Sequence, residues 1–296
     1  MNHPRITLEQ WAALKAVVEE GSYARAADAL SKSQSTVSYA IQKIEEQLPV
    51  KVLRQDGRKA VLTEAGQILY RRAVEVLKLA RDTEETARLL SEGWESEITV
   101  AIDVIADIEP LLWAFEALAK VSPITRVKMY ETSLSGTDEM LLERRVSLAI
   151  TPRVPPGFMG KKLETVSMIP VVHKHHPLAN KSDISENELK AYRQVVLRDS
   201  GTKRQQDAGW LGAEQRWTVS HFQTALGVVR RGLGFAFVPR SAAKELINCG
   251  EVVVLDLTWQ AERHIPVYLV PGSTTTNGPA TELLMEEIVK RFSSLR

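Results

Sequence analysis

The sequence predicts a mostly α-helical winged helix-turn-helix domain, then one long helix, then an α/β domain of two subdomains. Three observations lead to this prediction. Apolar residues recur at helical spacing in short segments before residue 50. A heptad pattern follows in residues 63–94. From residue 95 onward, strand-like segments alternate with helical ones. We therefore expect three regions, 1–62, 63–94 and 95–296.

The composition is that of an ordinary globular protein, with 44% hydrophobic and 25% charged residues. The single cysteine, Cys249, excludes an intramolecular disulfide and a cysteine-based zinc site. It fits a reducing cytosol, so we expect a cytoplasmic protein. The polar segment 1–10 lacks the apolar core of a signal peptide, and no apolar run approaches the ~18 residues that a membrane helix needs. The net charge of +1 does not favour nucleic acid, so any attraction to DNA must come from local placement of charge.

Three short helices are expected in residues 7–48. Thr7 and Gln10 have the spacing of a capping box at the start of the first helix. Gly21 and Ser22 end that helix and start a second one, "SYARAADAL", whose paired small residues allow a neighbouring helix to approach closely. Three polar residues then lead into a further helix. Two short helices joined by a tight turn form a helix-turn-helix unit.

The helix at 33–48 carries apolar residues on one face and an uncharged, hydrogen-bonding first turn. In a helix-turn-helix unit this turn faces the major groove, where a glutamine such as Gln34 can make a two-point contact with adenine. Hydroxyl groups beside it can bond bases or phosphates, and the helix dipole attracts phosphate. The alternative is an N-capped amphipathic helix with a polar tip. The candidate DNA-binding residues are Ser33, Gln34, Ser35, Thr36, Ser38, Tyr39 and Gln42.

A hairpin is expected in residues 50–63, because apolar residues alternate on either side of the turn signal Asp56-Gly57. Arg54, Arg58 and Lys59 lie at or beside this turn. A basic hairpin after a helix-turn-helix unit is a wing that contacts phosphates or enters the minor groove. Residues 1–62 hold nine Lys or Arg and seven Asp or Glu, a mild net charge of +2. The alternative is a solvated charged hairpin.

A long helix is expected to begin at Thr63 and to end near Gly93. Seven residues along it step by four and three, with Trp94 continuing the series, which is the pattern of a seam between two copies. The alternative is a helix that lies on its own domain. The seam residues are Leu69, Ala73, Val76, Ala80, Thr83, Ala87 and Leu90.

The stretch "LEQWAALKAVVEEGSYARAADALSKSQSTVSYAIQKIEEQL", followed by "LTEAG", closely resembles the N-terminus of LysR-type transcriptional regulators. Five positions depart from the usual pattern of that family. Pro49, Leu53 and Gln55 stand where the family usually has Gly, Phe and Arg, and Ser35 and Tyr39 replace the commoner Pro and Arg. These departures leave the expected fold unchanged, but they make the operator sequence unpredictable.

The remaining residues predict parallel or mixed sheets of the α/β class. In open α/β sheets a ligand lies outside the carboxyl ends of the strands. The expected strands are 97–103, 126–132, 146–151, 164–173, 193–199, 216–220, 234–239 and 252–257, and the expected helices are 108–120, 137–145, 185–192, 221–232 and 281–292.

The segments "HPLA" (176–179) and "VRRGLGFAFVP" (229–239) resemble the effector domain of the same family, which is similar in fold to periplasmic binding proteins. This likeness implies a first subdomain of about 95–160 and 270–296, a second of about 161–269, and a small-molecule effector in the cleft. Ser220 is expected as a helix N-cap that favours an anionic group. The alternative for each site residue is a satisfied loop or cap. The candidate effector-binding residues are Asp103, Val104, Thr132, Ser133, Ser200, Gly201, Thr202, Ser220 and His221.

Asp103 stands where the family often has a hydroxyl group, and its carboxylate would repel a carboxylate effector. An effector with an amine or hydroxyl group near Asp103 is therefore the expectation from sequence.

Other sequence features favour neither an enzyme nor a metal protein. The histidines at 173, 175 and 176 have no neighbouring carboxylate or cysteine cluster, and Gly232 to Gly234 lack the third glycine of a dinucleotide fingerprint. We expect no cofactor. The sequence therefore predicts a dimeric or tetrameric regulator that binds a pseudo-palindromic operator in double-stranded DNA and responds to an effector. RNA polymerase is a further candidate partner, and a cytosolic solute-binding protein is the alternative.

Overall fold

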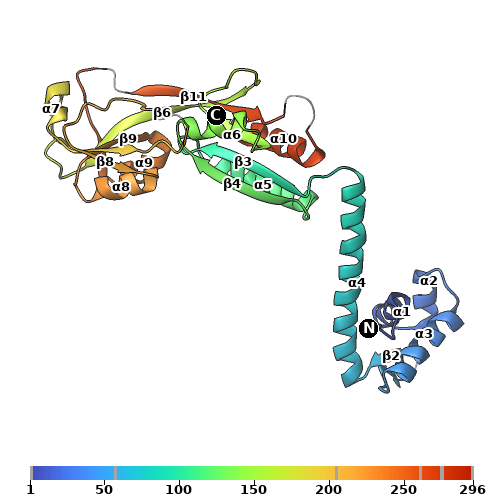
Figure 1. Cartoon of the computed structure of the whole chain (residues 1–296). Coiled ribbons are helices and arrows are strands. Elements are labelled where there is room, and N and C mark those ends of the chain that lie inside the picture. Colours follow the sequence, from blue (N-terminus) through green and yellow to red (C-terminus); the bar gives the residue numbers. More distant parts are fainter. Residues whose placement is uncertain (1–2, 57–58, 204–205, 260–261, 274–276, 295–296) are drawn as a thin grey trace. The chain divides into compact units, whose positions relative to one another are not determined.

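The computed structural model describes residues 3–56, 59–203, 206–259, 262–273 and 277–294. Within them the chain forms two compact units, residues 1–91 and 92–296 (Figure 1). None of the described helices combines the length and the apolar character that crossing a membrane requires. Each unit has hydrophobic clusters of its own.

The first unit is helical with one hairpin, as the sequence predicts. Thr7 and Gln10 form the expected capping box: the Thr7 N–H donates to Gln10 Oε1 at 2.9 Å, and the Gln10 N–H donates to Thr7 Oγ1 at 3.3 Å. Gly21 ends the first helix with φ +70°, a conformation that glycine adopts without strain. The elements are α1 (Leu8–Glu20), α2 (Tyr23–Ala29), α3 (Gln34–Gln47), β1 (Leu53–Asp56), β2 (Lys59–Leu62) and α4 (Glu64–Ser91).

The core of this unit holds α3 firmly. Val37, Ile41 and Ile44 are buried, as their spacing predicts, and Ala26 and Ala27 of α2 are buried beside them. The Glu45 carboxylate accepts a hydrogen bond from the Val52 N–H at 3.0 Å, which joins α3 to the start of the hairpin. Packing on α1 and α2 and this hydrogen bond to the hairpin therefore fix the position of α3 in the first unit.

Helix α4 begins at a cap that only glycine permits. Thr63 Oγ1 accepts a hydrogen bond from the Gly66 N–H at 2.9 Å, and a Cβ atom at Gly66 would lie 1.9 Å from the Val52 carbonyl oxygen. The helix ends at Ser91, and Gly93 follows with φ +82°. The expectation that Trp94 continues the heptad series is wrong, because the helix has already ended, and Trp94 packs against the core of the second unit.

The second unit is built on one mixed sheet of nine strands among the described residues. The strand order is β4-β3-β5-β11-β6-β9-β7-β8, with β10 paired to β6. Pairing is parallel at both ends, among β4, β3 and β5 and among β9, β7 and β8, and antiparallel in the middle. The strands are β3 (Glu97–Asp103), β4 (Arg126–Thr132), β5 (Leu148–Thr151), β6 (Lys161–His173), β7 (Gln194–Leu197), β8 (Arg216–Val219), β9 (Phe235–Pro239), β10 (Val252–Val254) and β11 (Arg263–Pro271).

Helices cover the sheet at both ends. Helices α5 and α10 pack on each other near β3 and β4, and α8 and α9 lie near β9 (Figure 1). Helix α9 is not predicted from sequence, because it is short and buries only Ala243. The helices are α5 (Glu109–Val121), α6 (Ser135–Leu142), α7 (Glu186–Lys190), α8 (Phe222–Arg230), α9 (Arg240–Asn248) and α10 (Pro279–Ser293).

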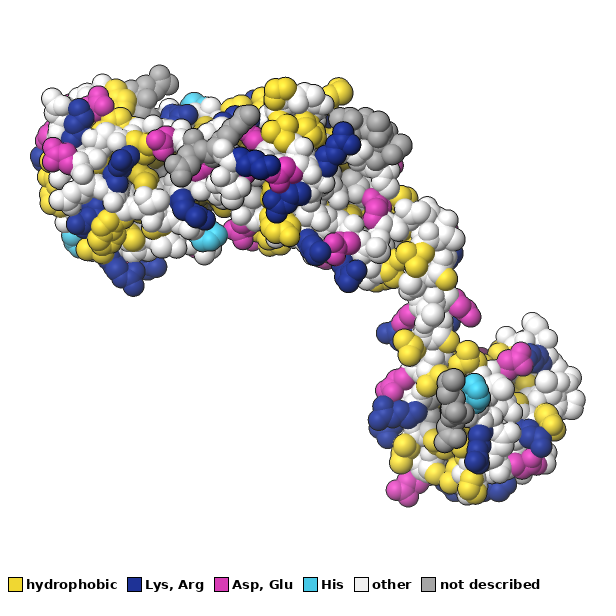
Figure 2. Space-filling view, in the orientation of Figure 1, with side chains coloured by type: hydrophobic (Ala, Val, Ile, Leu, Met, Phe, Trp, Pro, Cys, Tyr) yellow, Lys and Arg dark blue, Asp and Glu magenta, His cyan; other side chains and the backbone are white. Residues whose placement is uncertain are grey.

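The long strands β6 and β11 connect the two ends of the sheet. β6 begins at Lys161 and β11 ends at Pro271. We call the part around β3, β4 and β5 the first subdomain and the part around β7, β8 and β9 the second subdomain. On the visible face of this unit, basic and acidic side chains are intermingled (Figure 2), which agrees with the net charge of +1.

Candidate functional site

The first turn of α3 presents polar side chains on a well-packed helix. Ser33 is the N-cap, and its Oγ accepts a hydrogen bond from the Thr36 N–H at 3.1 Å. The same Oγ lies 2.8 Å from Ser35 Oγ and 2.7 Å from Thr36 Oγ1. The first and second turns are exposed at Gln34 and Ser38. Ser33, Ser35 and Thr36 thus form a local hydroxyl cluster, while Gln34 stands next to it.

Three further candidates lie beyond this turn. The Tyr39 ring is 60% exposed, and Lys43 Nζ lies 5.4 Å from its centroid. Gln42 donates a hydrogen bond from Nε2 to Glu46 Oε1 at 2.8 Å, so this amide is partly engaged. Arg54 is exposed on β1.

The expected hairpin forms, with Asp56 opposite Lys59, so Asp56 is the last residue of β1 and not part of the turn that the sequence predicts at Asp56-Gly57. Lys59 begins β2, but its side chain and all of Arg58 lie outside the described residues.

Helix α4 is covered on one side by its own unit. Ala73 is 1% exposed, and Leu69 packs against the core of the first unit. At these two positions α4 packs on its own unit, which is the alternative to a seam between two copies. Val76, Thr83, Ala87 and Leu90 are exposed, and Ala80 is partly exposed.

Helix α4 carries a second apolar stripe, which is more exposed than the predicted seam and is displaced from it around the helix axis. It consists of Ile68, Val76, Leu79 and Leu90, which are 53%, 44%, 68% and 51% exposed. An α-helix turns about 100° per residue, which brings these four side chains to one side. The sequence prediction misses Ile68 and Leu79, because a strict heptad assumes 3.5 residues per turn.

A cavity of about 920 Å³ opens in the second unit and is lined by both subdomains. Asp103, Leu134 and Arg153 contribute from the first subdomain. Most of the lining comes from the second subdomain and from the segment 206–211. A volume of this size is typical of small-molecule sites.

Asp103 ends β3 and is buried, with 2% of its surface exposed. Its Oδ1 accepts a hydrogen bond from the Ile105 N–H at 3.1 Å, and its Oδ2 accepts one from the Leu134 N–H at 3.2 Å. Burial raises the pKa of Asp103 to about 7, against the lowering effect of these hydrogen bonds and of Arg153. Asp103 therefore braces two strand ends, and a neutral form of it is accessible near neutral pH.

Most of the other predicted effector-binding residues lie close together. Their polar groups bond to other groups of the protein, however, and do not face the cavity. Ser200 Oγ accepts a hydrogen bond from the Ser133 N–H at 2.8 Å, and Ser133 Oγ donates to the Arg198 carbonyl at 2.7 Å. The Thr202 N–H donates to Glu139 Oε2 at 2.8 Å. None of Ser133, Ser200, Gly201 and Thr202 is among the residues that line the cavity.

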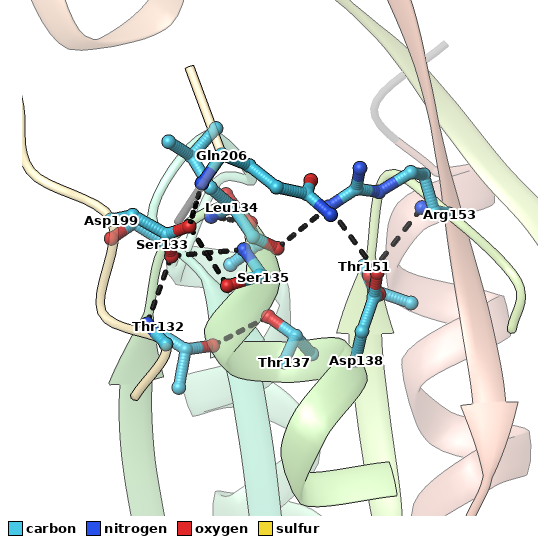
Figure 3. A network of polar contacts seen from close by, with 12 residues as sticks. Thr132, Ser133, Leu134, Ser135, Thr137, Asp138, Thr151, Arg153, Asp199 and Gln206 are labelled. Carbon is cyan, nitrogen blue, oxygen red and sulfur yellow. Dashed lines mark hydrogen bonds and ion pairs between the residues drawn. The ribbon is translucent and has the colours of Figure 1, made fainter. Parts of the chain in front are cut away.

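Asp199 is the centre of this contact, which we call the latch: residues 133–135 against residues 198–203 and Gln206. Figure 3 shows Asp199 and Gln206 beside Ser133 and Ser135. Its carboxylate accepts hydrogen bonds from the Ser135 N–H at 3.0 Å, from the Gly201 N–H at 2.8 Å and from the Gln206 N–H at 2.7 Å. Burial alone would raise the pKa of Asp199, but these hydrogen bonds hold it below its usual value. The latch joins the first subdomain to the segment that forms one wall of the cavity.

The neighbouring polar side chains of the first subdomain are also engaged. Thr132 Oγ1 lies 2.6 Å from Thr137 Oγ1, and the Val104 N–H donates to the Thr132 carbonyl at 2.8 Å. Arg153 donates from Nη2 to the Leu134 carbonyl at 3.0 Å and lies 3.2 Å from Asp138 (Figure 3). These strand ends therefore support the cavity wall.

The expected N-cap at Ser220 is wrong. Helix α8 starts at Phe222, its N-cap is His221, and His221 makes no side-chain capping bond. Ser220 lies one residue too early to cap this helix, and both residues are exposed and absent from the cavity lining. His221 Nδ1 instead lies 4.0 Å from Glu131 Oε2.

Several lining residues were not found from sequence. They include Gln194 at the start of β7, Trp210, Trp259, Phe237 on β9 and Arg263 on β11. Gln194 gives one available signal, because it begins an otherwise apolar strand, "QVVL". Among the described residues, no group of three or more His, Cys, Asp or Glu is placed to hold a metal ion.

The two units thus define a class of protein: a regulator that combines a winged helix-turn-helix unit with a two-subdomain ligand-binding unit. Residues 8–67 match the bacterial regulatory helix-turn-helix proteins of the lysR family, and residues 91–293 match the LysR substrate binding domain. The chain belongs to the LysR family of transcriptional regulators. It is a DNA-binding transcriptional regulator with an effector-binding domain, and not a solute-binding protein without a regulatory role.

Individual relatives agree with this assignment. YeeY of Escherichia coli (strain K12), an uncharacterized HTH-type transcriptional regulator, is 30% identical over 246 residues, which cover 81% of this chain and 80% of that protein. The probable HTH-type transcriptional regulator YhaJ of the same organism is 26% identical and covers 97% of both chains. The full-length regulator LysG of Corynebacterium glutamicum with bound effector Arg has the same fold, with a TM-score of 0.54, 22% identity, and 98% and 99% of the two chains covered.

Proposed function

We propose that the first turn of α3 reads base edges in the major groove of the operator. The observation that carries this proposal is an exposed, uncharged, hydrogen-bonding turn on a helix whose opposite face is anchored by Val37 and Ile41. Such a helix presents its N-terminal residues to base edges. Among the described residues Gln34 has no side-chain partner, so its amide is available to adenine. Ser35, Ser38, Tyr39 and Gln42 contact neighbouring bases or phosphates, and Ser33 and Thr36 shape the turn.

The hairpin supplies the charge that α3 lacks. Arg54, Arg58 and Lys59 contact phosphates at the flank of the site, which positions the protein without specifying sequence. Because the whole chain carries a net charge of only +1, this local contact provides the salt-dependent part of the affinity.

Two copies associate through the exposed stripe of α4 and bind a pseudo-palindromic operator with half-sites whole turns of DNA apart. The stripe of Ile68, Val76, Leu79 and Leu90 supports this proposal, since an unpaired apolar stripe of this length is costly to leave in water. Two such dimers form a tetramer. The protein acts in the cytoplasm on transcription, with RNA polymerase as its further partner, and has no catalytic role.

A small molecule in the cavity of the second unit modulates this activity. The ligand shifts the balance between two arrangements of the assembly by its difference in affinity for them. Support comes from the size of the cavity and from the latch, which connects the cavity wall to the first subdomain.

The test is selection from a random duplex pool by the full-length protein, followed by sequencing. Gln34→Ala should weaken binding by about 1–3 kcal/mol at one base position and relax the preference there. The matched control is Gln67→Ala, because Gln67 is an exposed glutamine of α4 away from α3. A two-fold motif that Gln34→Ala changes and Gln67→Ala leaves intact supports the proposal. An unchanged motif in Gln34→Ala removes Gln34 from base reading.

A further inference from the structure

One face of the second subdomain forms the floor of the cavity, and its pairing register shows which side chains share that face. Gln194 on β7 is paired with Arg216 on β8, so the two side chains lie side by side. Phe237 on β9 points to the same side, since Gln194 is paired with Phe235, two residues earlier on β9. On the far flank Arg263 of β11 is paired with Met168 of β6. All of these except Phe235 line the cavity.

Aromatic rings form one wall at this floor. Trp210 lies 6.5 Å from Phe237 and 6.4 Å from Trp259 between ring centroids. Trp210 is held by two hydrogen bonds: its Nε1 donates to Glu186 at 2.6 Å, and its carbonyl accepts from Gln194 Nε2 at 2.6 Å. The wall is therefore anchored in position before any ligand arrives. A planar ring can stack on it or meet it edge to face.

Two polar groups beside this wall have unused bonding capacity. Gln194 is 2% exposed, and its Oε1 has no hydrogen-bond partner, although its Nε2 is engaged. A buried acceptor without a partner is costly and marks a place for a donor. Arg263 has no side-chain hydrogen bond or ion pair within the part of the chain that the structure describes. Its Nη1 lies against Gly209, where an added Cβ would approach it to 3.2 Å.

Both groups meet at the same short segment. Gly209 contacts Arg263, and the next residue, Trp210, contacts Gln194. The Arg263 cation and the free acceptor Gln194 Oε1 thus both lie beside Gly209 and Trp210, where the aromatic wall begins. Two lining carboxylates, Asp103 and Asp207, limit the positive charge, and Asp103 is braced by the N–H groups of two loops.

We propose that this cavity binds a small organic anion whose planar ring carries an N–H or O–H donor. The anionic group pairs with Arg263, the donor group bonds Gln194 Oε1, and the ring packs on Trp210, Phe237 and Trp259. The ligand therefore lies on the second subdomain, and not on the strand-end hydroxyls of Ser133 and Ser200, which bond within the latch. This inference rests on the proposed function, in which the cavity is the effector site.

Four probes separate the three requirements in binding measurements on the full-length protein without DNA. The reference probe is 4-hydroxybenzoate. 4-Methoxybenzoate lacks the donor, 4-hydroxybenzamide lacks the charge, and 4-hydroxycyclohexanecarboxylate lacks the planar ring. The uncharged and donor-free probes should each bind about tenfold more weakly than the reference, and the non-planar probe about twofold to tenfold more weakly. Comparing probes tests Gln194 and the ring wall without changing the protein.

Variants test the position. Arg263→Met should weaken binding of 4-hydroxybenzoate about tenfold or more, and should abolish its preference over 4-hydroxybenzamide. Arg126→Met is the matched control, because Arg126 is an exposed arginine of β4 that does not line the cavity. Ser133→Ala should leave affinity for the probe within about twofold, since Ser133 is outside the cavity lining.

Two results overturn the inference. One is no binding of 4-hydroxybenzoate at about 10 mM, a concentration that fills even a millimolar site. The other is binding that Arg263→Met leaves unchanged. Failure of the proposed function is recognised separately, because operator selection without any probe reports on DNA reading alone.

Discussion

At the residue scale, Asp103 is a buried carboxylate at the end of β3, and backbone N–H groups donate hydrogen bonds to both of its oxygens. The sequence places it correctly at the end of a strand, where ligands of α/β sheets lie. What the sequence cannot show is that two backbone N–H groups from separate loops take up its oxygens. The same holds for Ser133 and Ser200. Both are strand-end residues, but their mutual hydrogen bond depends on how two distant segments fold together.

The buried carboxylate predicts a specific pH dependence. Asp103 has a pKa of about 7 in the folded chain, against an ordinary value of 3.8. Between these values the folded state keeps a proton that the unfolded chain releases, so the free energy of unfolding falls as pH rises, by on the order of 4 kcal/mol across the window. This stabilisation is complete below pH 3.8 and is lost above about pH 7.

Asp103→Asn should remove this part of the dependence, because an amide does not titrate. The variant should be less stable than wild type at low pH by about 1–3 kcal/mol, since its NH₂ group cannot accept the second backbone hydrogen bond. The deficit should shrink or reverse as pH rises through 7. Thermal unfolding of both proteins across this range measures the difference. Parallel curves would contradict the raised pKa.

At the element scale, the helices that pack within one unit could be predicted, except for the short helix α9, and the partner of α4 could not. Val37, Ile41 and Ile44 of α3 are buried as their spacing predicts. The apolar residues of α4 give an equally regular pattern, but a pattern does not say which surface covers it. Leu69 and Ala73 are covered by the first unit, while Leu79 is 68% exposed.

Leu79→Glu should therefore separate the proposed dimer. A carboxylate in the middle of an apolar contact loses its water and gains no partner, which costs several kcal/mol in each copy. Sedimentation at micromolar concentration should show monomers, with unchanged helix content in circular dichroism. The control is Gln67→Glu, which adds the same charge on another side of α4, at an exposed position. A dimer that persists in Leu79→Glu places the interface elsewhere.

The latch is the element most open to a test by substitution. Asp199→Asn should remove at least one of its three backbone hydrogen bonds and so loosen the hold on Ser135, Gly201 and Gln206. We expect faster amide hydrogen exchange at residues 201 and 206 and at 135, with little change in the first unit. Because the hydrogen bonds hold the pKa of Asp199 low, wild type should lose the same protection when pH falls through that pKa. Unchanged exchange at these sites would show that the latch is held by other contacts.

At the scale of the whole molecule, the chain has two sets of cores that share no residue. Ile44 is fully buried in the first unit, and Phe292 of α10 is 2% exposed in the second. The heptad pattern and the change to strands near residue 97 predict this division from sequence, since each marks a change of packing partner. The order of the strands could not be predicted, because β6 and β11 pair across the middle of a sheet that the sequence suggests as two.

Separate cores predict two unfolding transitions in calorimetry of the full-length protein. Ile44→Ala should lower the free energy of unfolding of the first unit, and Phe292→Ala that of the second, by about 2–5 kcal/mol each through the cavities they leave. Operator DNA should raise the midpoint of the transition that Ile44→Ala lowers, because a ligand stabilises only the unit that binds it. Each substitution is the control for the other. A single transition that both variants and DNA shift together would contradict this prediction, because it would mean that the two units unfold as one.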